Sequence, residues 1–410
     1  MRVRRAEREE AERSGPRMAP LALVVLTQLA LGVCSTDCGR ERAAGQPVSS
    51  SSAAPIAAPL SPTPTLTPKV TTAPKTAENV FLLASGSSLL ATGESDMVVR
   101  LRDPATLAVV GALEVPEIGA APPEFADASA ESSTAGERGH VVLRALAVAG
   151  DGRTLAASYG DPPRSAVVLW HVPADPKATA PTQLAKFEGV DAQSLALSRD
   201  GGRLAVATRT ATGMTVAVFD TAKQERTYGE SVARAARVAL SDDGTVLVVM
   251  AHGAPAEDRP MPGGGHEWVV NPPLLTWRSL TTHQHAQITG VHFSDFAVSE
   301  DGSSAVLGLY SNGYDVYRFA QGGAAGSQLV GRVRGLELST MAVTRDLGWL
   351  AFDDGNGLLE LVQLPQGKRR YRVRRQGSYL SAACFGLHGH LYWVDHGALS
   401  VADIGATLAP

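Results

Sequence analysis

One eleven-residue pattern occurs seven times along this 410-residue chain and constrains the fold more than any other feature. Each copy is a short apolar run, a tight turn and a second apolar run, as in LALSRDGGRLA at residues 195–205. Asp-Gly supplies the positive φ that a two-residue hairpin turn needs, and the flanking residues favour strands, so we predict a repeated β-hairpin. The other copies begin at Val80, Leu146, Val238, Phe296, Met341 and Ala382.

The spacing of the copies predicts a ring of blades. Successive turns are 41 to 66 residues apart, a period typical of arrays in which one unit cannot bury its own apolar face. A further strand after each turn ends in a bulky or polar pair, such as Trp170-His171, and most units then add one more strand. We therefore predict an all-β fold, a seven-bladed β-propeller of four-stranded antiparallel blades.

The repeated residues also resemble a known family. The pattern apolar-Ala-apolar-Ser-x-Asp-Gly, followed by a strand ending in a relative of Trp-Asp, is similar to WD-repeat and WD-like propellers from about residue 69 onward. Trp and Asp never occur together at that strand end, and the Gly-His that opens a full repeat is missing, so degenerate bacterial WD-like propellers are the nearer comparison. The resemblance implies the fold and no particular function.

Residues 1–34 are predicted to be an export segment. An apolar run of about 15 residues ends at Cys34, which is shorter than a membrane span and fits the core of a secretory signal. The sequence LGVC resembles a bacterial lipoprotein cleavage box, with Val33 in place of the usual small residue. Lipid attachment at Cys34 would make the membrane a partner; ordinary cleavage near Gly32 is the alternative, and Met18 is an alternative start.

Residues 35–68 are predicted to be a disordered linker, and 69–410 the propeller. In residues 45–76, Pro, Ser and Thr make up 18 of 32 residues, a composition that cannot bury enough apolar surface to fold. We interpret it as a stalk, or alternatively as a spacer with no fixed purpose. The prediction is an exported protein, either periplasmic or anchored to the outer membrane of a bacterium.

The last unit runs out of chain after its third strand, near Asp403. We predict that residues 69–74 supply its outer strand, because pairing both termini removes a weak seam. The alternative is that residues 407–410 complete the blade alone.

Composition and motifs favour binding over catalysis. The net charge is −4, so we expect no nucleic-acid partner, and we expect a monomer. The chain has no nucleophile elbow, His-Glu-x-x-His, phosphate-binding loop or Cys-x-x-Cys. We therefore expect no enzyme activity, no cofactor, and an unidentified protein as partner. The alternative is an enzyme resembling a hydrolase or lactonase that acts on a small metabolite in the central channel.

The channel lining is predicted from the residue six positions before each turn. This set contains one base, Arg237, and one acid, Asp295, on neighbouring blades, which we expect to form an ion pair. It lacks the several carboxylates or histidines that channel-site hydrolysis requires. The predicted lining is Asn79, Ala145, Ser194, Arg237, Asp295, Thr340 and Ser381.

Two long insertions are predicted to emerge on one face. In an antiparallel four-stranded blade, the loops between strands two and three leave from the same face as the links between blades. Residues 118–139 are such a link and 251–271 such a loop, so we predict a binding surface there. Its candidate residues are His252, Asp258, Arg259, His266, Glu267 and Trp268.

Each insertion also has a simpler interpretation. The acidic residues 118–139 can be a solvated loop. The second insertion carries metal-ligand residue types, but their spacing matches no known metal site. Trp268 is either an aromatic anchor for a partner or packed on the rim of the ring.

The basic run KRRYRVRR at 368–375 falls on the outer strand of blade six. We expect it to prevent edge-to-edge aggregation. The alternative is contact with an anionic membrane surface or polysaccharide.

Overall fold

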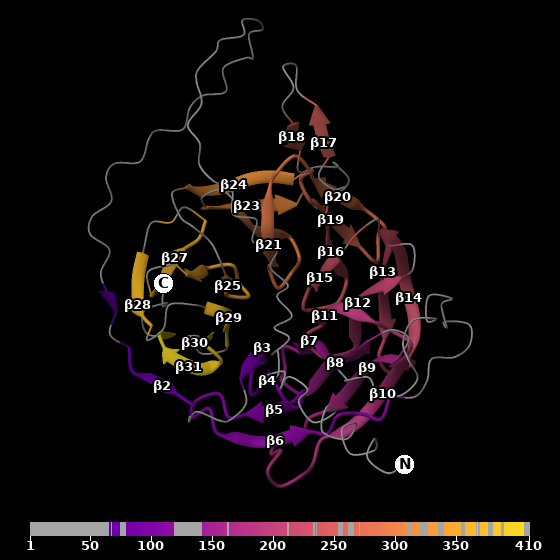
Figure 1. The fold of residues 1–410 in the computed structure, drawn as a ribbon, viewed down its shortest axis with the longest axis vertical. Helices are drawn as coiled ribbons and strands as arrows, with labels where there is room; N and C mark the ends of the chain where they lie inside the picture. The colour runs from indigo at the N-terminus through magenta and orange to yellow at the C-terminus, as the bar shows by residue number, and fades with distance from the viewer. Residues whose placement is uncertain are drawn as a thin grey trace, which may run out of the picture. The chain divides into compact units, whose positions relative to one another are not determined.

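The described residues form a ring of seven blades, each with four antiparallel strands, and one blade carries a fifth, parallel strand (Figure 1). The export segment with Cys34, most of the acidic insertion, and residues 407–410 lie outside the described part. The computed structural model describes residues 65–66, 68–73, 79–118, 142–161, 164–210, 213–232, 234, 236–252, 257–260, 266–269, 271–309, 313–319, 327–334, 340–353, 357–365, 367, 370–375, 380–386 and 389–405.

Blades one to three each contain four consecutive strands, running outward from the ring axis. Blade one contains β3 (Val80–Ser85), β4 (Leu90–Glu94), β5 (Val99–Arg102) and β6 (Val109–Leu113). Blade two contains β7 (Leu143–Val148), β8 (Thr154–Asp161), β9 (Arg164–His171) and β10 (Thr182–Glu188). Blade three contains β11 (Ala192–Leu197), β12 (Arg203–Thr210), β13 (Gly213–Asp220) and β14 (Glu225–Val232).

Blades four and five repeat this order, with one addition. Blade four contains β15 (Ala236–Leu240), β16 (Val246–Ala251), β19 (Leu274–Ser279) and β20 (His285–Ile288). A separate hairpin, β17 (Glu257–Pro260) and β18 (His266–Val269), interrupts it between β16 and β19. Blade five contains β21 (Phe293–Val298), β22 (Ser304–Leu309), β23 (Gly313–Phe319) and β24 (Ser327–Arg334).

Blades six and seven each take a strand from the N-terminal side of the propeller. Blade six contains β25 (Met341–Val343), β26 (Trp349–Asp353), β27 (Leu358–Gln363) and β28 (Arg370–Arg374), and β1 (Thr65–Leu66) adds a fifth, parallel strand to β28. Blade seven contains β29 (Leu380–Phe385), β30 (His390–Asp395), β31 (Ala398–Asp403) and, as its outer strand, β2 (Val70–Thr72).

The seam between the two ends of the propeller is closed by β2. Thr71 lies opposite Val401, and the Thr72 and Ser400 hydroxyls are 3.0 Å apart. The prediction that residues 69–74 supply the outer strand of the last blade is confirmed. The pairing of β1 with β28 lies further upstream, and the sequence did not predict it.

The core is divided among the interfaces between blades. Among the described residues there are seven apolar clusters, and each joins residues of two neighbouring blades, including blades seven and one. At the last of these interfaces, Tyr392 and Val394 pack with Val80 and Leu90, all at most 4% exposed. Burying one such side chain contributes roughly 1.5–3 kcal/mol, so the ring is held by its side-to-side contacts.

The inner hairpins depend on a serine that the sequence analysis did not explain. The Ser198 hydroxyl donates to the Asp200 carboxylate (2.7 Å) and accepts from the Arg203 amide (2.9 Å). Because the Ser198 amide bonds the Arg203 carbonyl (3.0 Å), four residues lie in the loop, and Gly201 takes a φ of 70°. The predicted two-residue turn is wrong here, since the side-chain bonds stabilise a wider loop.

The two ends of each blade differ in their connections. We call the side that carries these Ser-x-Asp-Gly turns the turn face. Strands two and three, and successive blades, are connected on the opposite side, which we call the insertion face because hairpin β17–β18 extends from it. Figure 1 shows this hairpin at the edge of the ring beside blade four. No helix in the described ranges has the length and apolar character needed to cross a bilayer.

Candidate functional site: the two ends of the channel

The turn-face end of the channel is joined by backbone hydrogen bonds from blade to blade. The Arg199 amide donates to the Asp242 carbonyl (2.8 Å), Asp242 to Glu300 (2.6 Å), and Glu300 to Arg345 (3.0 Å). Ser87 to Gly150 and Asp151 to Arg199 extend the series, so the turns of blades one to six are connected. Backbone groups satisfied in this way leave little freedom for this end to open.

Arg345 narrows the same end of the channel. Its guanidinium lies 2.9 Å from the Asp242 carboxylate, two blades away. A Cβ added to Gly150, on blade two, would overlap the Arg345 Nη1 atom. The side chain of Arg345 thus reaches across the channel from blade six toward blades four and two.

The insertion-face end begins with repeated β-bulges. Five inner strands carry one extra residue near their start, and a bulge re-aims the side chains around it. The extra residues are Phe81, Arg144, Gln193, Ser294 and Ser381.

The predicted channel lining stays a prediction, and its register differs between blades. In five blades the predicted residue lies three positions before the last paired residue of the inner strand. These residues are Ala145, Ser194, Arg237, Asp295 and Thr340. In blades one and seven that position belongs to Leu82 and Ala382. Asn79 precedes β3, and Ser381 is a bulged residue. The hairpin loops of blades one and seven are shorter than that of blade three. The residue six positions before the turn therefore lies earlier in the strand register in these two blades.

Arg237 and Asp295 form the predicted ion pair. The Arg237 Nη1 atom lies 2.6 Å from Asp295 Oδ1, connecting blades four and five. Burial raises the pKa of Asp295, and the charge of Arg237 opposes this. The Asp295 side chain keeps 27% exposure, so it is surrounded by protein yet reachable by water in the channel.

His252 lies at the end of β16, close to two arginines. Its side chain is exposed at the mouth of the channel. Partial desolvation lowers its pKa, and the positive charges of Arg237 and Arg234 add to this effect. His252 is therefore kept neutral near pH 7 in an electropositive neighbourhood.

A second charged group lies between blades two and three. The Arg144 Nε atom is 3.2 Å from Asp191 Oδ1, and Gln193 donates to the same oxygen (3.1 Å). Asp191 is 3% exposed, and burial raises its pKa against the charges of Arg144 and Arg209.

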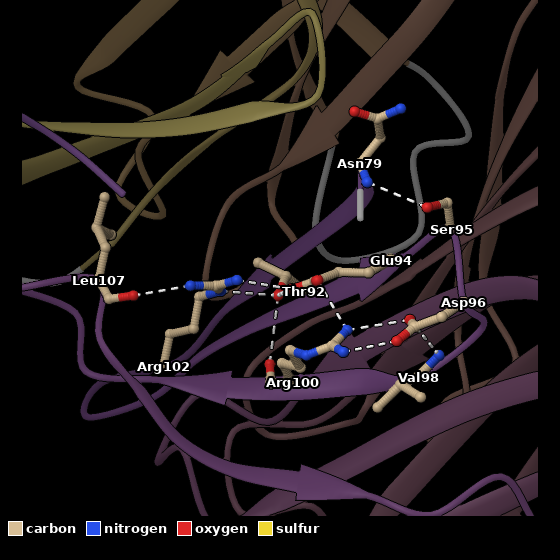
Figure 2. A network of polar contacts seen from close by, with 9 residues as sticks. All are labelled: Asn79, Thr92, Glu94, Ser95, Asp96, Val98, Arg100, Arg102 and Leu107. Atoms are coloured by element: carbon tan, nitrogen blue, oxygen red, sulfur yellow. Dashed lines mark hydrogen bonds and ion pairs between the residues drawn. The ribbon is translucent and has the colours of Figure 1, made fainter. Parts of the chain in front are cut away.

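Blade one carries a buried polar network that extends from its insertion-face loop toward its turn-face end (Figure 2). The fully buried Glu94 accepts from Arg100 and Arg102, each at 2.7 Å. Arg102, 3% exposed, also donates to Thr92 (3.1 Å) and to the Leu107 carbonyl (2.9 Å). Figure 2 shows these side chains turned toward one another, so their charges are used within the blade.

Blades six and seven use an arginine in the same way. Arg375 is fully buried and pairs with Asp353 (2.5 Å) and Asp395 (3.5 Å). In the basic run, Arg372 pairs with Glu360 (2.8 Å), and Val373 is buried. The run forms outer strand β28 as predicted, and β1 covers its edge.

The second insertion was predicted as a loop, but its backbone forms hairpin β17–β18. Asp258 lies opposite Trp268, Arg259 opposite Glu267, and Pro260 opposite His266. The side chains of these residues lie outside the described part of the chain, so their roles in binding stay predictions.

Other chemistry in the described residues is sparse. No group of three metal-ligating side chains occurs among them. Cys384 is a free thiol whose pKa burial raises to about 12, so it is not a reactive thiolate. On the turn face, a groove of about 180 Å³ between blades one and two is lined in part by Asp103 and Lys177.

Sequence reasoning missed several charged residues of the insertion face. Arg144, Asp191, Arg209 and Arg234 were not selected, because only one position per inner strand was considered. Each lies beside the start of an inner strand or near the end of a second strand. A search of the residues at the start of each inner strand and at the end of each second strand would have found them.

Comparisons with known proteins support the fold. No protein-family model matches the chain, and no curated protein matches it. Among solved structures, the Myceliophteria thermophila Cps50 (Swd1) β-propeller domain is similar with a TM-score of 0.54 at 11% identity, covering 82% of this chain and 99% of that one. Kuenenia stuttgartiensis hydrazine synthase is similar with a TM-score of 0.55 at 13% identity, covering 81% and 97%. The chain therefore shares the fold of a WD40-type propeller.

Proposed function

We propose that this protein is a non-catalytic binding propeller of the WD-like type that docks a protein partner on its insertion face. The observation that carries the proposal is the difference between the two channel ends. The turn face is joined by backbone bonds and narrowed by Arg345, whereas the insertion face presents His252, the exposed Arg237 and hairpin β17–β18. Loops that extend from a rigid scaffold commonly carry binding.

A site-specific crosslinking experiment tests the docking face. A photoreactive residue replaces His252 on the insertion face or, as the matched control, the exposed Lys177 on the turn face. In cells, we expect a discrete crosslinked protein from position 252 and none from position 177. Equal crosslinking from both positions, or none from either, would reject the proposal.

We further propose that the chain is exported to the bacterial envelope and anchored through a lipid on Cys34. The LGVC sequence and the Pro-rich linker support this proposal. Mass spectrometry of the mature N-terminus tests it. We expect a lipid-modified Cys34, and an unmodified N-terminus would eliminate the anchor.

A further inference from the structure

Four guanidinium groups lie along one side of the channel mouth, on blades two to four, and we call them the arginine arc: Arg144, Arg209, Arg234 and Arg237. Arg144 and Arg237 stand near the starts of inner strands β7 and β15. Arg209 stands near the end of β12, and Arg234 lies in the link between β14 and β15. All four positions belong to the insertion face.

Two members of the arc are partly neutralised. Arg144 donates to the Gly160 carbonyl (2.8 Å) and pairs with the buried Asp191. Arg237 pairs with Asp295, yet its side chain remains 51% exposed. These two carboxylates fix the position of the arc without covering it.

The other two members are available to a ligand. Arg209 and Arg234 are exposed, and within the described part of the chain neither has an ion pair or a side-chain hydrogen bond. Their charges nevertheless act on this site, since Arg209 affects the pKa of Asp191 and Arg234 that of His252. The mouth therefore has an excess of positive charge over blades two to four.

This excess is not general to the insertion face. Around blades six, seven and one, the insertion-face arginines Arg375 and Arg100 have side chains at most 22% exposed and lie in ion pairs with buried carboxylates. On the insertion face, guanidinium groups left in solvent beside the channel are thus concentrated on blades two to four.

The extent of the arc indicates the form of its ligand. Stacked sheets lie about 10 Å apart, so groups on three successive blades are too widely spaced for one phosphate or carboxylate. An extended peptide rises about 3.3 Å per residue, so acidic side chains two or three residues apart match neighbouring blades. We propose that the arginine arc binds an acidic peptide segment of the partner protein, which makes this inference dependent on docking at the insertion face.

The test measures binding of a fluorescent hexaglutamate peptide to the mature chain by anisotropy at low and at physiological salt. The variant is Arg209→Gln with Arg234→Gln. The matched control is Arg318→Gln with Arg374→Gln, which removes the same charge from exposed positions on β23 and β28. Because neither pair is placed in a buried ion pair, both variants should fold, which circular dichroism checks.

We expect the arc variant to bind the peptide about three- to tenfold more weakly, the control to bind like wild type, and added salt to weaken binding. Equal loss in both variants, or no peptide binding, would overturn the proposal. So would full competition by millimolar inorganic phosphate, which indicates a small-anion site, or preferential binding of a single-stranded oligonucleotide. If crosslinking at position 252 succeeds while hexaglutamate fails, docking stands and only the acidic-peptide inference falls.

Discussion

Aspartates at the two ends of the channel have pKa values displaced in opposite directions. At the turn face, hydrogen bonds from the Gly202 amide and the Ser198 hydroxyl lower the pKa of Asp200. At the insertion face, burial raises the pKa of Asp191 and of Asp295. The same residue type is stabilised as an anion at one end and destabilised as an anion at the other.

This difference distinguishes aspartates that stabilise the hairpins from aspartates that position charged groups beside the channel. At the turn face, the carboxylates of Asp200 and Asp243 accept hydrogen bonds from their own hairpins. At the insertion face, Asp191 and Asp295 instead hold arginines beside the channel although burial disfavours their charged forms. Perturbation of this second kind is typical of functional sites.

The largest expected effect tests whether blade one, unlike blades two to four, uses its charged residues for stability. Glu94→Ala in blade one leaves the buried Arg102 guanidinium without its carboxylate, so we expect a loss of about 3–5 kcal/mol in the free energy of unfolding. Urea denaturation measures it, with the exposed Glu114→Ala as control. A loss below 1 kcal/mol would show that blade one does not depend on this network.

A turn-face substitution should have the next largest effect. The buried Ser241 hydroxyl donates to Asp243 (2.6 Å) and accepts from the Val246 amide (2.9 Å), so Ser241→Ala leaves that amide unsatisfied. We expect a loss of about 1–3 kcal/mol in urea denaturation. The exposed Ser231→Ala is the control, and equal effects for the two would mean that the turn serine has no special role.

Sequence predicted the turn face better than the insertion face for a physical reason. The hydrogen bonds of a Ser-x-Asp-Gly turn form between residues close in sequence. A complete motif therefore fixes the position of the turn and the register of its hairpin. The turn aspartate is present in blades two to six and absent from blades one and seven, and in those two blades the register-equivalent positions are Leu82 and Ala382 in place of Asn79 and Ser381. Bulges and ion pairs between blades depend on the closed ring, which no single segment encodes.

The ion pair of Arg237 and Asp295 was predictable because equivalent positions of adjacent repeats become neighbours once the repeats form a ring. The Glu94 network was not, because it depends on the pairing register of β4 with β5. Thr92 lies opposite Arg100 and Leu90 opposite Arg102, a register that only the folded blade defines.

The pH dependence of stability should differ in sign between the ends. For Asp243, burial raises the pKa, but hydrogen bonds from Ser241 and Thr245 outweigh it, so the pKa lies below the usual 3.8. Its stabilisation is present above that value and lost as pH falls through the folded-state pKa. Asp191 has a raised pKa, so its contribution is most favourable below 3.8 and is lost as pH rises through its folded-state pKa.

Thermal melts from about pH 3 to 7 test both signs. Asp243→Asn should reduce the loss of Tm in acid, and Asp191→Asn should reduce the loss of Tm as pH rises above the usual carboxyl pKa. Shifts of the same sign in both variants would remove the distinction between the ends.

The smallest expected effect concerns the side chain that crosses the channel. Arg345→Ala removes a partly exposed ion pair with Asp242, so we expect a loss of about 0.2–1 kcal/mol. Gly150→Ala should be tolerated better in that variant than in wild type, because the added methyl group then meets no guanidinium. Equal costs of Gly150→Ala in the two backgrounds, measured by a double-mutant cycle, would place Arg345 away from blade two.

Pairing of β2 with β31 makes ring closure a late step in folding, because β31 is synthesised long after β2. Thr72 lies beside Ser400, 328 positions later in the sequence, so the ribosome synthesises one partner long before the other. Closing so large a loop is slow and entropically costly, and an incomplete chain leaves blade seven without its outer strand. A product of interrupted synthesis therefore cannot complete the ring and exposes an open sheet edge. Closure thus makes completion of the ring conditional on synthesis of the chain through β31.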